Sequence, residues 1–253
     1  WAAPAVAETY TVDTIADALL ASEGRLSDLR LDYTFTHRAW NKPKGPMLVT
    51  QAIFAQKISK RSAERLRYLD CEVRVVDPNT KNRILQDHTL ASFNGEATVI
   101  LRRKVNSGRP MKGYVLGGYK SDAFGGYAWD PHTKIWYYHT KMSLGAFLKK
   151  YASEFRVESQ SEALDGIPTT KLVGTWQDSH NGQSFTMKLW VSPERSFLPL
   201  KRQIIDVDGT MLSETALYDL VQLPNGMWYP KTIRSPAEPP GIAHPAVAHI
   251  YDI

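Results

Sequence analysis

Residues 196–234, SFLPLKRQIIDVDGTMLSETALYDLVQLPNGMWYPKTIR, decide the fold class of this 253-residue chain. Two turn signals, Asp208-Gly209 and Asn225-Gly226, separate runs in which apolar and polar residues alternate. Such alternation is typical of a half-buried β-strand, and both dipeptides accept the positive φ angles of tight hairpin turns. The stretch therefore predicts two consecutive antiparallel hairpins, with Gly209 or Gly226 at positive φ.

Alternating segments of the same kind continue along most of the chain, with glycine, proline and polar residues between them. The predicted strands are Arg30–His37, Leu48–Ser59, Arg65–Val76, Ile84–Phe93, Ala97–Arg103, Phe155–Ser159, Thr170–Gln177, Ser184–Val191, Leu200–Val207, Met211–Gln222, Trp228–Arg234 and Ala246–Ile253. About a dozen strands at this spacing predict a mainly β fold built on antiparallel pairing.

Two segments have the apolar spacing of a helix instead. They are Thr11–Gly24 and Ser143–Tyr151, the second capped by Ser143. Because strands account for most of the chain, the apolar faces of these helices have few surfaces to cover except the sheet. We therefore expect an α+β arrangement in which a strongly curved sheet carries both helices on its concave side.

Several strands are apolar on both faces, for example Ala97–Leu101 and Phe185–Val191. A strand of this kind needs cover on each side. One interpretation is a filled β-sandwich core. The other is a curved sheet around a ligand cavity, with the helices as its lid.

The composition sets further bounds. The net charge is +5, the pI is about 9.1, and 43% of the residues are hydrophobic, enough for a sizeable core. No stretch approaches the roughly 18 apolar residues of a membrane span. The single cysteine, Cys71, excludes an internal disulfide and lies among apolar strand residues.

Two basic segments, Lys57–Arg67 and Arg102–Lys112, raise the question of nucleic-acid binding. Their cations alternate with core positions, as on a solvated strand face, whereas nucleic-acid sites need a basic face with stacking aromatic residues. We expect no nucleic-acid partner and keep contact with a membrane surface open.

Residues that carry catalysis or bind metals do not occur at diagnostic spacings. Asp130, His132 and His139 lack a standard metal-ligand spacing, and no Gly-x-Ser-x-Gly elbow is present. The glycine pairs 117–118 and 125–126 do not open a helix after a strand, as a phosphate loop requires. We therefore expect no catalytic residue, no metal and no cofactor.

The middle of the chain differs from the rest, because Gly113–Tyr138 mixes glycine pairs with many aromatic residues. These aromatic residues either fill an ordinary core or form a rim of Tyr and Trp over an apolar cavity. Tyr114, Tyr119, Trp129 and Trp136 are the first candidates for such a rim.

The order of these elements resembles the LolA-like superfamily of bacterial outer-membrane lipoprotein-sorting proteins and their relatives. The resemblance rests on IADALLASEGRLSDLRLDYTFT (residues 15–36), FNGEATVIL (93–101), the mid-chain helix and the paired C-terminal hairpins. It implies an incomplete antiparallel β-barrel whose helices cover a cavity that holds lipid or acyl chains. The sequence assigns no counterpart to the buried arginine by which the family's carrier contacts its lid.

The resemblance covers roughly residues 11–253, which we expect to form a single lipid-binding domain with a Gly/aromatic-rich insertion near 106–142. Residues 1–10 are expected to form a flexible N-terminal segment left after removal of a signal peptide.

The function implied by the resemblance is that of a non-catalytic binding protein of the periplasm or cell envelope. Such a protein holds a lipid or lipoprotein acyl chain, takes part in lipoprotein sorting and meets an envelope protein partner. Two alternatives remain open: a regulatory or scaffold domain of the same fold that contacts a protein partner, and a secreted hydrolase.

The residues expected to bind the ligand share inward strand positions or belong to the aromatic rim. They are Leu31, Tyr33, Phe35, Phe54, Tyr68, Phe93, Val99, Tyr114, Trp129 and Trp136. Together they should line an apolar pocket of roughly several hundred Å³, the usual size of a small-ligand site.

Overall fold

The structure is a computed structural model that describes residues 9–26, 28–39, 48–58, 65–76, 80, 82–104, 109–118, 131–139, 142–177, 182–237 and 247–252. Most of the predicted N-terminal segment and much of the predicted insertion lie outside these residues, and so do Tyr119 and Trp129.

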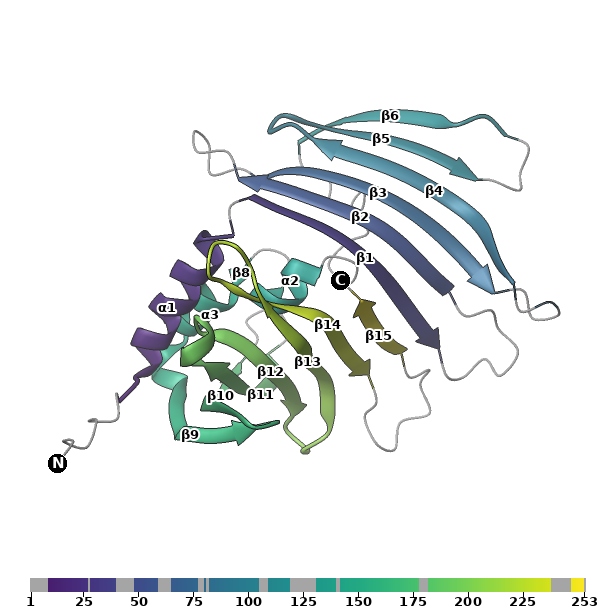
Figure 1. Ribbon diagram of the computed structural model, residues 1–253. Helices are drawn as coiled ribbons and strands as arrows, with labels where there is room; N and C mark the ends of the chain where they lie inside the picture. The colour runs from purple at the N-terminus through teal and green to yellow at the C-terminus, as the bar shows by residue number, and fades with distance from the viewer. Residues whose placement is uncertain are drawn as a thin grey trace.

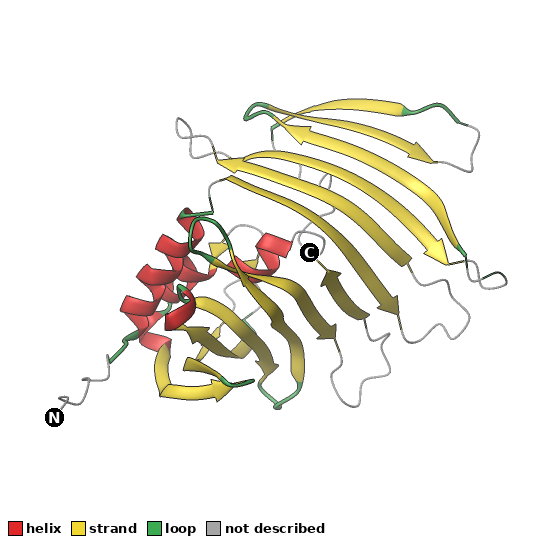
Figure 2. Ribbon diagram, in the orientation of Figure 1, coloured by secondary structure: helices red, strands yellow, loops and turns green. Residues whose placement is uncertain are grey.

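Antiparallel pairing joins thirteen strands in one open, curved sheet (Figures 1 and 2). The strands are β1 Asp28–Ala39, β2 Leu48–Ile58, β3 Arg65–Val76, β4 Arg83–Phe93, β5 Ala97–Lys104, β6 Lys112–Gly117, β9 Phe155–Leu164, β10 Ile167–Gln177, β11 Ser184–Ser192, β12 Leu198–Asp206, β13 Met211–Gln222, β14 Trp228–Ala237 and β15 Val247–Asp252. Their order across the sheet is β6-β5-β4-β3-β2-β1-β15-β14-β13-β12-β11-β10-β9. Two further short strands, β7 Tyr137–His139 and β8 Met142–Ser143, pair separately.

The sheet consists of two meanders that the last strand joins. We call β1–β6 the N-terminal half and β9–β14 the C-terminal half, because β15 pairs with β1 on one side and with β14 on the other. Within the described residues the outer strands β6 and β9 do not pair with each other, so the sheet stays open. The predicted incomplete antiparallel barrel is confirmed.

Three helices lie on the concave side of the sheet (Figure 1): α1 Val12–Gly24, α2 Pro131–Trp136 and α3 Leu144–Lys150. Helix α1 begins with a capping box in which the amide of Thr14 donates to the Thr11 hydroxyl at 3.2 Å. The α1 and α3 backbones approach so closely that a Cβ on Gly145 would lie 2.7 Å from the Ala16 carbonyl oxygen. The expected position of both predicted helices is therefore confirmed.

The helices and the C-terminal half enclose a filled core. Phe147 of α3 contacts Trp176 of β10 edge to face, with ring centroids 5.1 Å apart, and Phe155 at 5.9 Å. Leu172 and Leu189 of the sheet are completely buried in the same cluster. On this half of the concave side, side chains of the protein itself occupy the space between sheet and helices.

The two predicted hairpin turns are confirmed. Gly209 has a φ of 85° and Gly226 a φ of 78°. The amide of Asp206 donates to the Thr210 carbonyl at 2.8 Å, which closes the first turn, and an equivalent bond between residues 223 and 227 closes the second at 2.7 Å. A third turn at Asp165-Gly166, also at positive φ, joins β9 to β10. It makes both strands longer than the sequence predicted.

Replacing Gly226 with valine should lower the stability by about 1–2 kcal/mol, because a β-branched residue is strained at positive φ. Thermal unfolding would measure the change. Gly117→Val is the matched control, since Gly117 lies in an extended strand and a Cβ there would meet nothing within 4 Å. Equal melting temperatures for the two variants would contradict the turn geometry.

Candidate functional site

Pairing register separates the two faces of the N-terminal half. Directly paired residues of antiparallel strands project to the same face. Leu69, Ala91, Ile100 and Tyr114 form one such cross-strand row. Leu69 and Ala91 are buried, and so is Phe93 two residues further along β4. All three belong to the cluster that includes the helices, so this face is the concave one.

Four predicted ligand-binding residues lie on β1 and β2, for which the structure gives the strand pairing. Leu31 pairs with Phe54, and Phe54 pairs with Leu69 of the buried row. Tyr33 and Phe35 follow Leu31 at two-residue steps on β1. Their role in lining a cavity stays a prediction.

Two predicted residues lie on the opposite face. Tyr68 and Val99 both pair with Ser92, one residue out of phase with the buried row, and they are 42% and 37% exposed. The prediction that they point inward with Phe93 is wrong. Strands β3 and β5 carry apolar residues on both faces, so alternation alone did not fix which set is buried.

The structure describes two of the aromatic rim candidates, one exposed and one buried. Tyr114 stands on the edge strand β6 and is half exposed. Trp136, at the end of α2, is 1% exposed and lies in the core instead of at a rim. Its indole nitrogen is buried with no hydrogen-bond partner among the described residues.

A pocket opens where two neighbouring strands of the C-terminal half separate. Strands β12 and β13 pair from their connecting turn as far as Lys201 and Ala216. Beyond this point β13 continues along β14, while Leu198 and Pro199 remain paired with β11. We call the space between the separated strands the fork pocket, and its volume is about 250 Å³. Its lining residues are Leu164, Asp165, Ile167, Arg195, Leu200, Leu217, Tyr218, Asp219 and Leu220.

The fork pocket has an apolar floor and a charged mouth. Leu200 and Leu217 are buried at its base and belong to the core cluster. The Arg195 guanidinium lies 4.2 Å from the centroid of the Trp228 ring, which holds it beside the opening. Asp219, on the opposite strand, accepts a hydrogen bond from the Thr232 hydroxyl at 3.2 Å. An aliphatic ligand with a polar end matches this arrangement.

Unusual backbone angles surround the same pocket. Among the described residues, the non-glycine residues with positive φ are Asp165, Ser196, Phe197 and Asp219. Two of them line the pocket and the other two directly follow Arg195. Each such residue is held by its surroundings at a cost of about 1–3 kcal/mol, and such residues concentrate at functional sites.

A buried arginine that the sequence did not single out fixes α2 to the sheet. Arg202 of β12 donates through Nη1 to the Tyr137 carbonyl at 2.7 Å and through Nη2 to the Lys134 carbonyl at 3.2 Å. The signal was available, because Leu198, Leu200 and Arg202 share the inward phase of β12. Burial, and secondarily the Arg202 charge, lowers the pKa of Lys134 to about 8.

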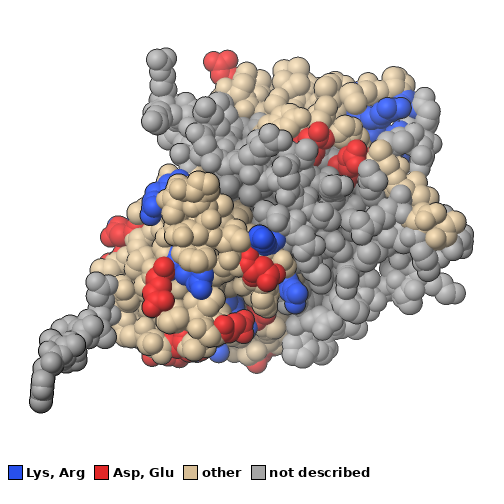
Figure 3. Space-filling view, in the orientation of Figure 1, with Lys and Arg blue, Asp and Glu red and all other residues tan. Residues whose placement is uncertain are grey.

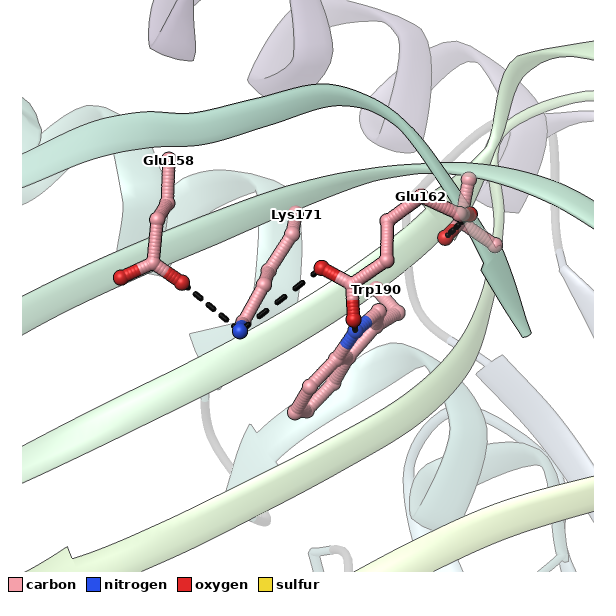
Figure 4. Close-up of polar contacts among 5 residues, drawn as sticks. Glu158, Glu162, Lys171 and Trp190 are labelled. Atoms are coloured by element: carbon pink, nitrogen blue, oxygen red, sulfur yellow. Dashed lines mark hydrogen bonds and ion pairs between the residues drawn. The ribbon is translucent and has the colours of Figure 1, made fainter.

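The outer face of the C-terminal half carries a self-contained polar network (Figure 4). The Lys171 ammonium lies 2.7 Å from Glu158 and 5.1 Å from the centroid of the Trp190 ring, while the Trp190 indole donates to Glu162 at 3.1 Å. The hydrogen bond between Lys171 and Glu158 raises the pKa of the lysine and lowers the pKa of the carboxyl. These groups satisfy one another, so the network is a solvated outer surface.

Neither a metal cluster nor a membrane-spanning helix occurs among the described residues. No group of three or more His, Cys, Asp or Glu side chains there is arranged to hold a metal ion. None of the described helices is long and apolar enough to cross a membrane.

Comparison with known proteins identifies similar structures. No protein-family model matches the chain, and no curated protein sequence matches it. A DUF1329 family protein from Desulfovibrio piger is 14% identical with a TM-score of 0.53, over 96% of this chain and 91% of its own. A candidate outer membrane lipoprotein-sorting protein domain from Vibrio parahaemolyticus is 11% identical with a TM-score of 0.49, over 95% and 88%. A LolA superfamily protein from Nitrosomonas europaea is 12% identical with a TM-score of 0.46, over 97% and 93%.

At these identities the comparisons bear on the fold alone. The likeness to the D. piger protein covers nearly the whole chain, so the complete architecture is shared. An open, curved antiparallel sheet with helices on its concave side is the arrangement that the resemblance implied. The predicted fold is therefore confirmed, and the D. piger protein shares it.

The lysine on α2 should make stability depend on pH. Lys134 binds its proton less tightly in the folded protein, with a pKa of about 8, than in the unfolded chain, with a pKa near 10.5. Its burial therefore costs stability fully below pH 8, and stability recovers as the pH rises from 8 to 10.5. Lys134→Met should stabilise the protein at pH 7 by up to about 3 kcal/mol, and by less at each higher pH.

Urea unfolding at several pH values would measure this effect, with Lys150→Met on the exposed side of α3 as the control for loss of a lysine. A Lys134→Met variant that is no more stable than the natural chain at pH 7 would contradict the burial cost.

Proposed function

We propose that the chain is a non-catalytic binding protein of the cell envelope that holds an acyl chain of a lipid or lipoprotein. Residues 11–253 would act as one lipid-binding domain in the periplasm, with a part in outer-membrane lipoprotein sorting. The shared architecture supports this proposal, because an open curved sheet with helices on its concave side presents apolar strand faces to a ligand.

The observation that carries the proposal is the fork pocket between β12 and β13. Its aliphatic side chains can cover part of an acyl chain, and each buried methylene contributes about 0.8 kcal/mol. Arg195 can donate hydrogen bonds to the polar end of such a ligand, since stacking on Trp228 orients the guanidinium, and Asp165 and Asp219 in the same lining can accept hydrogen bonds from it. The volume of about 250 Å³ accommodates part of a chain, and we propose that the remainder follows the concave face of the N-terminal half.

One observation favours the alternative of a regulatory or scaffold domain. Phe147, Trp176 and Leu172 fill the concave side of the C-terminal half, as in a domain with no internal ligand. In that case the function would reside in contacts with a protein partner. Nothing in the geometry of the described residues favours the third alternative, a secreted hydrolase.

Filling the fork pocket tests the proposal directly. Ile167 lines the pocket and is only half-buried, so Ile167→Trp should fold while it excludes part of the ligand. Excluding two methylene groups costs about 1.6 kcal/mol, which is more than tenfold in affinity for a fluorescent fatty acid. Ala163→Trp, at an exposed position of the same hairpin, is the matched control and should bind normally.

Native mass spectrometry after gentle purification supplies the second measurement. A carrier should retain a heterogeneous set of lipids. If the natural chain purifies without lipid and binds no fatty-acid probe, the carrier proposal is wrong and the alternative of a regulatory or scaffold domain is favoured.

A change on β1 tests the ligand-binding role predicted for the N-terminal half. Phe35→Asp should abolish probe binding, because a carboxylate is poorly solvated in an apolar pocket. Circular dichroism must show that the variant keeps its fold, since the same change would also destabilise a filled core. Unchanged probe binding by a folded Phe35→Asp variant would restrict the site to the fork pocket.

A further inference from the structure

Large exposed apolar side chains gather at one end of the sheet. Among the described residues, all but one of them belong to β3–β6 or to the residue just before β6. They are Tyr68, Ile84, Val99, Leu101, Met111, Tyr114, Val115 and Leu116, which we call the distal patch. The exception is Val207, in the turn between β12 and β13. Single exposed apolar residues are ordinary, but a contiguous group marks an interaction surface.

The distal patch covers both faces of the sheet edge. Tyr68, Val99 and Val115 belong to one register row on the outer face, through Ser92. Tyr114 and Leu116 alternate with Val115 and therefore stand on the other face of β6, where they are also exposed. Figure 1 shows β5 and β6 at the end of the sheet away from α1 and α3. The hairpin thus extends beyond the helical cover and presents apolar side chains in two directions.

The other half of the same sheet shows what an ordinary outer face looks like in this protein. Trp190, an aromatic residue on that outer face, is 6% exposed and lies beneath the ammonium groups of Lys171 and Lys201. Tyr68 has a comparable outward position on β3 but remains 42% exposed. The apolar exposure is therefore a property of the distal end and not of the outer face in general.

Basic side chains border the distal patch. The exposed cations at the end of β5 and the start of β6 are Arg102, Arg103, Lys104, Arg109 and Lys112. In Figure 3, basic side chains lie among acidic and uncharged ones in the upper part of the molecule, where Figure 1 places β4–β6. The acidic side chain of Asp70 on β3 is held by His88, whose Nε2 lies 2.6 Å from its carboxylate. Apolar side chains with a cationic border match a binding partner whose interior is apolar and whose surface is anionic.

We propose that the distal patch docks on an anionic lipid surface. Valine, leucine and tyrosine side chains at an edge enter the boundary between headgroups and acyl chains, where tyrosine keeps its hydroxyl in water. Each neighbouring cation adds attraction to an anionic leaflet. A lipid surface fits better than a soluble protein partner, because a folded partner would cover one face of β6, whereas lipid surrounds both. The inference does not depend on the fork pocket.

Vesicle co-sedimentation tests the proposal. The natural chain should bind vesicles of phosphatidylcholine with phosphatidylglycerol, bind phosphatidylcholine alone weakly, and lose binding as salt is raised. Val115→Asp should weaken binding about tenfold or more, because the loss of one buried valine is worth about 1.5 kcal/mol. The double change Arg103→Glu with Lys112→Glu should remove the preference for anionic vesicles.

The chain provides a closely matched control. Val207 is 74% exposed and Val115 is 73% exposed, so Val207→Asp makes the same chemical change at an equally accessible site outside the distal patch. It should change the affinity for vesicles by less than about twofold, because salt screens a surface charge that is remote from the membrane. Both variants should keep the fold by circular dichroism, since neither valine is buried.

Three outcomes would overturn the proposal. In the first, the natural chain does not bind anionic vesicles. In the second, Val207→Asp weakens vesicle binding as much as Val115→Asp does. In the third, sedimentation would show a dimer that Val115→Asp dissociates, without vesicle binding, so that a second copy covers the patch. Fatty-acid probe binding by Val115→Asp separates this test from the proposed function, because the fork pocket is untouched and should fill normally.

Discussion

The architecture depends on one strand pairing on both of its edges. Thr34 of β1 and Thr232 of β14 both pair with Asp252 of β15, although about two hundred residues separate them in the sequence. Without β15, each meander would leave one unpaired edge in the middle of the sheet, where backbone donors and acceptors need partners. With β15 in place the sheet is continuous, and its concave side extends from Phe93 of β4 to Leu172 of β10 in one apolar cluster.

The fork pocket follows from a conflict between two contacts of β13. Near its start this strand pairs with β12, but the tip of the hairpin that it forms with β14 contacts α1, where Arg25 donates to the Asn225 carbonyl at 3.1 Å. Asp219 lies between these contacts with a φ of 54°, which bends the strand. Pro199 of β12 has no amide hydrogen to offer. The hairpin tip is thus held at the helix while the end of β12 stays on β11, and the two strands separate between these contacts.

Local chemistry explains which features the sequence could predict. Asp208-Gly209 and Asn225-Gly226 specify their own turns, so the C-terminal hairpins follow from a few neighbouring residues, and β13 has the predicted bounds. The same kind of turn at Asp165-Gly166 extends β9 and β10 beyond their predicted ends.

Non-local contacts limited the rest of the prediction. The buried face of β3 and β5 is set by what the folded sheet packs against, so Tyr68 and Val99 were placed on the wrong side. The bend at Asp219 has no sequence signal, because aspartate is common at ordinary strand ends. Arg202 was detectable, since a charged residue among inward-facing leucines must have buried partners.

The two ends of the sheet face different physical requirements. On the outer face of β9–β13, Trp190 lies beneath two lysines. The charged network of Glu158, Lys171 and Glu162 on the same face can be solvated by water. At the distal patch the chain exposes valine, leucine and tyrosine on an edge strand, where unpaired backbone groups already favour association. A chain selected only to fold and stay in solution gains nothing from Val115 at such a position, because threonine, which is also β-branched but polar, would fit an exposed strand equally well. Contact with another phase or molecule would explain the apolar edge, and the bordering cations favour one with an anionic surface.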